Sequence, residues 1–260
     1  ANNALVVQKP AGIATQAAPG VTSLETLLRA QLSDRSDYLA FPHRLDRPVS
    51  GLILVAIRKR AARLLSDQFA SRKVSKVYHA WVRGRVHADV LGRWVDHVRK
   101  ITDKAQTEIV SGDTEGAKVA ETEARLLAYD STGNRSLLEL SPLTGRMHQL
   151  RIQTAHRGFP IIGDWQYGFG QTPETPKDGS ESVKRGQLAS ETDAARPFAA
   201  SGHEQTYLTS SHEGRSSDAV VKIAQGPERI LLQAHQITFH DPTTGALKTV
   251  TASDDAFERV

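Results

Sequence analysis

Apolar positions along the chain follow the two periodicities that distinguish strands from helices. Short apolar runs and alternating stretches predict strands at residues 5–8, 51–57, 76–82, 135–140, 230–239 and 248–251. In the third of these segments the alternation places Tyr78, Ala80 and Val82 on one side of the strand. Turns rich in proline and glycine follow the first strand and separate the last two. Strands therefore outnumber helices in the predicted structure.

Three other segments carry apolar residues at helical spacing. A helix capped by Ser23 is predicted over the leucines of residues 24–32. A second, with many basic side chains, is predicted at Arg58–Lys73, and a third at about Arg146–Arg157, stopped by Gly158. Because strands and helices do not alternate regularly, we predict an α+β fold with a mainly antiparallel mixed sheet flanked by helices.

Residues 170–226 differ from the rest of the chain in composition. They are rich in Ser, Thr, Gly, Glu and Ala and show little periodicity. Six Lys/Arg and eight Asp/Glu stand between Gln171 and Gly226, so this stretch is acidic within a chain of net charge +4. We interpret it as a polar insertion in a single domain that spans residues 1–260. The basic balance then belongs to the patterned segments.

Composition narrows the possible functions. A pI near 9.4 favours a polyanionic partner. The absence of cysteine excludes disulfide scaffolds, thiolate metal sites and cysteine catalysis. No apolar stretch is long enough to span a membrane, and the first residues lack the pattern of a secretory signal. We therefore expect a cytoplasmic protein without a membrane partner.

The segment Phe41–Gly51 carries the first candidate for chemistry. Asp46 stands close to Arg44 and Arg47 in a turn-rich loop that leads into a buried strand. Positive charge on both sides favours the carboxylate form of such an aspartate. Taken alone, the pattern fits a structural ion pair as well as a catalytic group.

A second candidate is the octapeptide Thr144–Arg151, which gathers Arg146, His148 and Arg151 at a predicted helix start. Helix starts attract anions, although a solvated basic turn would look the same. His148 and His156 raise the possibility of a metal site, but no third group of ligands accompanies them, so we expect no metal. RNA contact is the better interpretation of this segment.

Tyr78, on the strand at residues 76–82, is the third candidate. Its ring offers a face on which a base can stack, although a lone tyrosine on a strand is more often part of the core. The chain has neither a glycine-rich phosphate loop nor a serine-hydrolase elbow, which argues against nucleotide-driven and serine-hydrolase functions.

Taken in order, these segments resemble the RluA-type pseudouridine synthase family over almost the whole chain outside the insertion. The blocks that match are KPAG at residues 9–12, HRLD at 43–46 with Ser50-Gly51, KVYHA at 76–80, GRMHQLR at 145–151, PIIGD at 160–164 with Tyr167-Gly168, QAH at 233–235 and DPTTG at 241–245. The resemblance implies the pseudouridine synthase catalytic fold with a central RNA-binding cleft, and an isomerase that needs no cofactor and no metal.

Residue roles follow from the resemblance where the motifs align. It implies that Asp46 is the catalytic carboxylate, that Arg151 is its ionic partner and that Tyr78 stacks on the flipped uracil. Arg44 would fill the place that the uridine leaves, and a base within the site, which Tyr78 could supply, would take the proton from carbon 5. We further expect His43, Arg146 and His148 to contact RNA. The aspartate either attacks the ribose or promotes elimination, and the sequence leaves both routes open.

Two alternatives remain at this stage. An RNA-binding protein that has lost catalysis would keep the basic cleft, and a nucleoside or glycoside hydrolase would need a second carboxylate, for which Asp164 is the candidate. The expected partner is ribosomal or transfer RNA, and we expect a monomer. We also expect the chain to begin at the catalytic domain, without the small N-terminal RNA-binding domain that some relatives carry.

Overall fold

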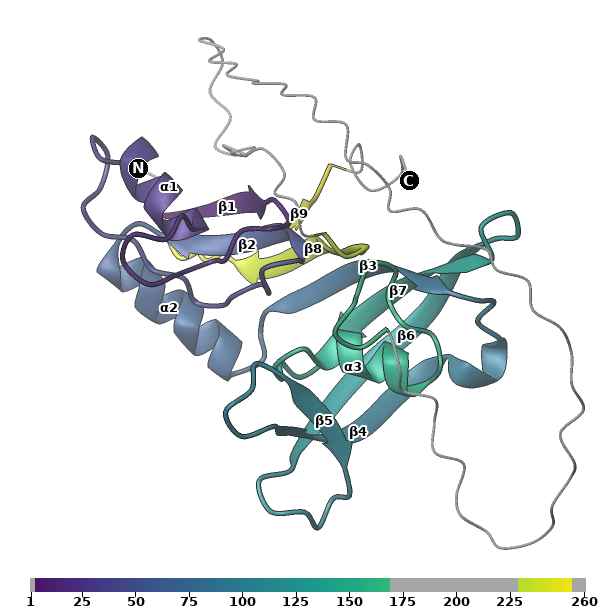
Figure 1. Ribbon diagram of the computed structural model, residues 1–260. Helices are drawn as coiled ribbons and strands as arrows, with labels where there is room; N and C mark the ends of the chain where they lie inside the picture. Colours follow the sequence, from purple (N-terminus) through teal and green to yellow (C-terminus); the bar gives the residue numbers. More distant parts are fainter. Residues whose placement is uncertain (1–2, 169–228, 254–260) are drawn as a thin grey trace, which may run out of the picture.

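The computed structural model describes residues 3–168 and 229–253, and within them the chain forms one mixed sheet with three helices (Figure 1). The strands are β1 (Ala4–Lys9), β2 (Ser50–Ala56), β3 (Ser75–Arg83), β4 (Gly92–Lys100), β5 (Thr107–Val110), β6 (Lys118–Asp130), β7 (Arg135–Pro142), β8 (Leu232–His240) and β9 (Leu247–Thr251). The helices are α1 (Leu24–Gln31), α2 (Lys59–Ala70) and α3 (Gln149–His156), with a short 3-10 helix at Ala88–Val90.

The order of the strands in the sheet is β1-β2-β8-β3-β7-β6-β4-β5, and β9 pairs with β8. All described pairs are antiparallel except β2 and β8, which run parallel over two residue pairs. The predicted α+β class with a mainly antiparallel sheet is therefore confirmed. Among the described residues no helix is long and apolar enough to cross a membrane.

The six predicted strands are all present, whereas β4, β5 and β6 were not predicted from the sequence. The third helix was predicted to start at Arg146 but starts at Gln149, because His148 adopts a left-handed conformation with φ 53°. The second helix was predicted to reach Lys73 but ends at Ala70, and Arg72 beyond it has φ 56°. Left-handed residues end or delay a helix since L-residues do not continue it in that conformation.

Ser23 caps α1 as predicted. The Ser23 hydroxyl accepts from the Thr26 backbone N–H at 3.2 Å, and the Thr26 hydroxyl accepts from the Ser23 N–H at 2.9 Å. Such a reciprocal capping box satisfies two donors that the first turn would otherwise leave free. The helix is thereby fixed with Leu24 and Leu28 fully buried.

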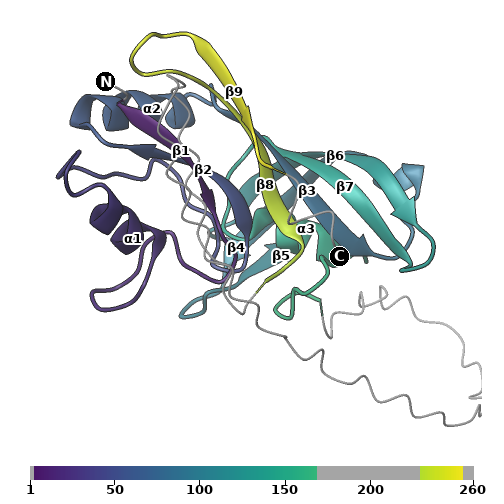
Figure 2. The same cartoon turned by 90° about the horizontal axis from the view of Figure 1, so that it is seen from above.

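Strand β2 is buried on both faces. Ile53 and Val55 belong to the larger core with α1, while Leu52, Leu54 and Ala56 pack in a second core with α2. The two helices accordingly lie on opposite faces of β1 and β2 (Figure 2). A third, smaller core packs α3 on β4 and β6 through Ile152, Val98 and Ala120.

Candidate active site

A cavity of about 670 Å³ opens where the loop before β2, the start of β3 and the turn before α3 meet. We call it the central cavity. All seven residues singled out from the sequence line it, namely His43, Arg44, Asp46, Tyr78, Arg146, His148 and Arg151. Segments separated by up to about a hundred residues in the chain thus bring their polar side chains to one place.

The loop that carries Asp46 is tied to the turn after β1 by two reciprocal pairs of hydrogen bonds. The Thr15 hydroxyl donates to the Leu45 carbonyl at 3.0 Å and accepts from the Leu45 N–H at 3.1 Å. The Gly12 N–H donates to the Arg47 carbonyl at 2.9 Å, and the Arg47 Nε donates back to the Gly12 carbonyl at 3.0 Å. Asp46 stands between the two tied residues, so its backbone position is well defined.

Lys9 lies beneath the same loop and was not singled out as a functional residue from the sequence. Its side chain is fully buried, and Nζ donates to the carbonyls of Pro10 and Ile13 at 2.8 Å and of Arg47 at 3.3 Å. Burial lowers the pKa of Lys9 to about 7, although the nearby charge of Asp46 acts in the opposite direction. The KPAG motif, which begins at Lys9, was the feature of the sequence that could have indicated this role of Lys9 in supporting the loop of Asp46.

Arg151 has a different main partner from the one predicted. Its Nε and Nη2 donate to the two carboxylate oxygens of Asp164 at 2.6 and 2.8 Å, whereas Nη1 lies 3.5 Å from Asp46 Oδ2. Burial acts to lower the pKa of Arg151, but the hydrogen bond and charge of Asp164 outweigh it and raise the pKa. The contact with Asp46 is therefore a secondary, longer ion pair of a guanidinium that Asp164 holds in place.

This pairing also changes the reading of Asp164. Its side chain is only 1% exposed, and both carboxylate oxygens are used by Arg151. A water-activating carboxylate needs a free oxygen and room for the water between the two acids. The hydrolase interpretation therefore loses its one candidate for the second carboxylate.

His148 links Asp46 to Tyr167, which belongs to one of the matching motifs but had no role assigned from the sequence. Nδ1 of His148 lies 2.8 Å from the Tyr167 hydroxyl, and Nε2 lies 3.7 Å from Asp46 Oδ2. The Tyr167 hydroxyl already accepts from the Thr107 N–H at 2.9 Å, so its own proton is available to His148 Nδ1. Burial lowers the pKa of His148 more than Asp46 raises it, which favours a neutral ring with Nε2–H toward Asp46.

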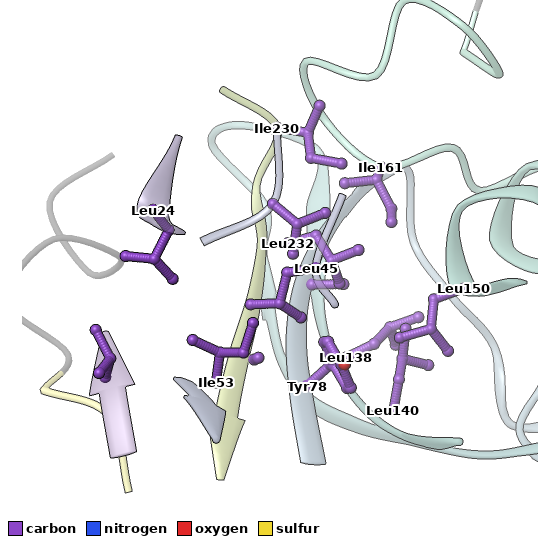
Figure 3. Packing of buried hydrophobic residues seen from close by; sticks show 14 of the residues in the cluster. Leu24, Leu45, Ile53, Tyr78, Leu138, Leu140, Leu150, Ile161, Ile230 and Leu232 are labelled. Atoms are coloured by element: carbon purple, nitrogen blue, oxygen red, sulfur yellow. The ribbon is translucent and has the colours of Figure 1, made fainter. Parts of the chain in front are cut away.

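Tyr78 lies on the wall of the central cavity with its ring packed among Leu138, Leu140 and Leu150 (Figure 3). Burial and the negative charge of Asp46 both raise the pKa of the phenol. The phenol is therefore protonated at neutral pH, which disfavours the role of base that the resemblance left open for Tyr78. Its ring remains available to the cavity.

The side chains of the remaining candidates differ in how many hydrogen bonds they already form within the protein. Arg44 is exposed and forms no hydrogen bond or ion pair within residues 3–168 and 229–253. Arg146 donates through Nε to the Val119 carbonyl at 2.9 Å. His43 Nε2 accepts from the Leu54 N–H at 2.8 Å, and its ring stacks on Phe69. These contacts show that His43 holds the loop against β2, and its contact with RNA stays a prediction.

Metal ligands do not gather in the part of the chain that the structure describes, where no group of three or more His, Asp or Glu side chains is placed to hold an ion. The two histidines that raised the possibility of a metal site do not lie together. His148 contacts Tyr167 and Asp46, and His156 lies at the far end of α3.

Comparison with known proteins relates this site to a family. Residues 3–156 match the family described as RNA pseudouridylate synthase. Ribosomal large subunit pseudouridine synthase C of Haemophilus ducreyi is 35% identical over 171 residues, which make up 63% of this chain and 50% of the relative. tRNA pseudouridine synthase C of the same species is 38% identical over 175 residues, covering 63% of this chain and 70% of the relative.

Among solved structures, the human RNA Pseudouridylate Synthase Domain Containing 1 has a similar fold, with a TM-score of 0.63 at 23% identity. The match covers 98% of this chain and 81% of that one. The chain spans about half the length of the first curated relatives that it matches.

Proposed function

Because the chain belongs to the RNA pseudouridylate synthase family, we propose that it isomerises uridine to pseudouridine within RNA. The observation that carries this proposal is the position of Asp46. It is a partly exposed carboxylate at the cavity, with Arg151 and His148 within 3.7 Å and the ring of Tyr78 on the adjoining wall.

The reaction moves the sugar from N1 to C5 of the same uracil, so it needs no redox step and no net gain or loss of atoms. Cleavage of the C–N bond develops positive charge on the ribose, and the carboxylate of Asp46 is suited to stabilise or trap it. After the uracil turns, C5 bonds to the sugar and releases a proton, and N1, whose bond to the sugar has broken, takes up a proton, so that the product is an isomer of the substrate. Because the phenol of Tyr78 is held protonated, the carboxylate of Asp46 is the better acceptor for that proton.

A uridine in a folded RNA must leave its stack to reach Asp46, at a cost of a few kcal/mol. Arg44 is suited to occupy the vacated place, since it is exposed beside Asp46 and carries no contact that it would have to break among the described residues. Tyr78 would stack on the extruded uracil, and Arg146 with His148 would contact the neighbouring backbone.

The printed names of the relatives guide the choice of substrate. One acts on the large ribosomal subunit and another on tRNA, so we propose ribosomal or transfer RNA as the partner here. A monomer in the cytoplasm, organised as a single domain with a polar insertion at residues 170–226, completes the proposal. Those residues lie outside the part of the chain that the structure describes.

An inactive RNA-binding protein is the competing function. It would retain positive charge around the cavity but would have no need for a carboxylate at position 46 in contact with Arg151. The two functions differ in whether a product forms, so one assay separates them.

The test is pseudouridine mapping by carbodiimide-dependent reverse-transcription stops. RNA is compared from cells with the intact gene, a deletion, the Asp46→Asn variant and the matched surface variant Asp34→Asn. We expect a stop that is present with the intact gene and Asp34→Asn and lost in the other two. A stop that persists with Asp46→Asn would overturn the assignment of Asp46, and no stop lost in the deletion would favour the inactive protein.

A further inference from the structure

A second cavity, of about 910 Å³, adjoins the central cavity. It lies between the β4–β5 hairpin and the turn at residues 145–147, and we call it the hairpin groove. Gly145, Arg146 and Met147 line both cavities, so this one turn forms their shared border. A single strand of RNA that passes through the central cavity can therefore continue into the hairpin groove.

Positively charged side chains outnumber negatively charged ones in the hairpin groove, and they differ in how free they are to bind a ligand. Four cationic side chains face two acidic ones, Glu108 and Glu115. Arg99 is paired with Glu108 through Nε at 3.0 Å and Nη2 at 2.8 Å, which leaves little of its charge for a ligand. Arg146 uses Nε on the Val119 carbonyl but keeps its remaining guanidinium N–H groups.

Lys100 and Lys118 are the available cations. Both are exposed at the groove, and neither forms a hydrogen bond or an ion pair with another residue in the described ranges. They lie on the neighbouring strands β4 and β6, where Lys118 is paired in register with Val98. The groove thus presents two unpaired ammonium groups from adjacent strands next to Arg146.

The chemistry of the lining selects among possible ligands. The hairpin groove contains no aromatic side chain on which a base could stack. Mobile lysines suit a phosphate better than a base edge, because an ammonium is a point charge without a fixed hydrogen-bonding plane. We infer that the hairpin groove binds the phosphodiester backbone of the RNA strand next to the extruded uridine, with Lys100 and Lys118 as its phosphate contacts.

The inference rests on the proposed function and can be tested separately from it. Each phosphate contact to a single strand contributes about 0.7 to the slope of log binding constant against log salt concentration, equivalent to roughly 5-fold in affinity near 0.1 M salt. The probe is a fluorescein-labelled single-stranded oligouridylate of about 16 nucleotides. Its dissociation constant is measured by anisotropy over a series of salt concentrations with the full chain.

For Lys100→Gln/Lys118→Gln we expect the slope to fall by about 1.4 and the affinity near 0.1 M salt to drop roughly 25-fold. The matched control Lys59→Gln/Arg125→Gln removes the same charge from exposed positions outside both cavities and should keep the wild-type slope. An unchanged slope in the groove variant, or an equal fall in the control, overturns the inference.

Pseudouridine formation by the wild-type chain is measured alongside. If the product forms while the groove variant keeps its slope, the groove assignment fails and the function stands. If no product forms although the groove variant loses its slope, the proposed function fails, and with it the placement of the groove beside an extruded uridine.

Discussion

Arg151 and Asp164 form a buried ion pair whose two members depend on each other. Replacing Arg151 by Met leaves the Asp164 carboxylate buried without its partner, which costs about 3–5 kcal/mol of unfolding free energy. In Arg151→Met/Asp164→Leu both charges are gone, and we expect a smaller loss than in the single variant. Urea denaturation of the wild type, both single variants and the double variant measures this coupling.

If the two single losses simply add in the double variant, the pair does not act as a unit. Arg151 would then owe its position to other contacts, such as its 2.8 Å hydrogen bond to Gln166.

His43 is expected to make the protein sensitive to mild acid. Burial and the charge of Lys76 lower its pKa to about 3, well below the value near 6.5 of an unfolded histidine. The folded chain therefore binds fewer protons at this site, so the stability that neutral His43 provides is complete above pH 6.5 and is lost as the pH falls toward 3. Between pH 7 and pH 5 the loss is about 1–2 kcal/mol, reduced by the partial exposure of the ring.

The variant His43→Gln isolates this effect, since an amide oxygen can accept the Leu54 N–H and does not titrate. Urea denaturation at pH 7 and pH 5 should show a smaller difference for the variant than for the wild type. Equal differences would mean that other groups, such as His148, account for the acid sensitivity.

The sequence identified which residues gather at the site but not how they pair. Motif order was enough to bring Asp46, Tyr78 and Arg151 to one cavity. The bidentate bond of Arg151 to Asp164 could not be predicted, because it depends on how the turn after α3 folds back on the helix. The hydrogen bond of His43 could not be predicted for a similar reason, since its partner Leu54 lies on the neighbouring strand β2.

The junction of β2 and β8 depends on a residue without a side chain. Gly51 has φ +114°, and a Cβ there would lie 2.3 Å from the Ala234 carbonyl oxygen. Gly51→Ala should therefore separate the only parallel pair among the described strands and destabilise the chain by more than about 3 kcal/mol. Gly145→Ala, where a Cβ meets nothing within 4 Å, should stay within about 0.5 kcal/mol in the same denaturation experiment.

A loss in Gly51→Ala no larger than in Gly145→Ala would show that the two strands can move apart without cost. The loop of Asp46 would then be less firmly connected to the sheet than its hydrogen bonds indicate.

Three of the strands could not be predicted from the sequence, for a physical reason. β4, β5 and β6 alternate buried positions with charged ones and have few buried apolar side chains, so their apolar pattern is weak. Their neighbouring strands are also linked by cross-strand ion pairs, including Arg99 with Glu108. Such pairs become visible only once the register is known. The hairpin groove lies on this part of the sheet, so it could not be predicted either.

At the scale of the whole molecule, the proposal that residues 170–226 are an insertion in one domain can be tested by removing them. The chain segments on either side are already joined, since the Leu231 N–H donates to the Ile162 carbonyl at 2.9 Å and the Trp81 N–H to the Leu231 carbonyl at 3.0 Å. Replacing residues 170–226 by a flexible linker of about six residues should therefore leave the denaturation midpoint nearly unchanged. The same linker inserted after Ser253, beyond the end of β9, monitors any effect of the linker itself. A marked fall in the midpoint for the excised chain alone would show that residues 170–226 contribute to the core, and the single-domain proposal with an insertion would have to be replaced.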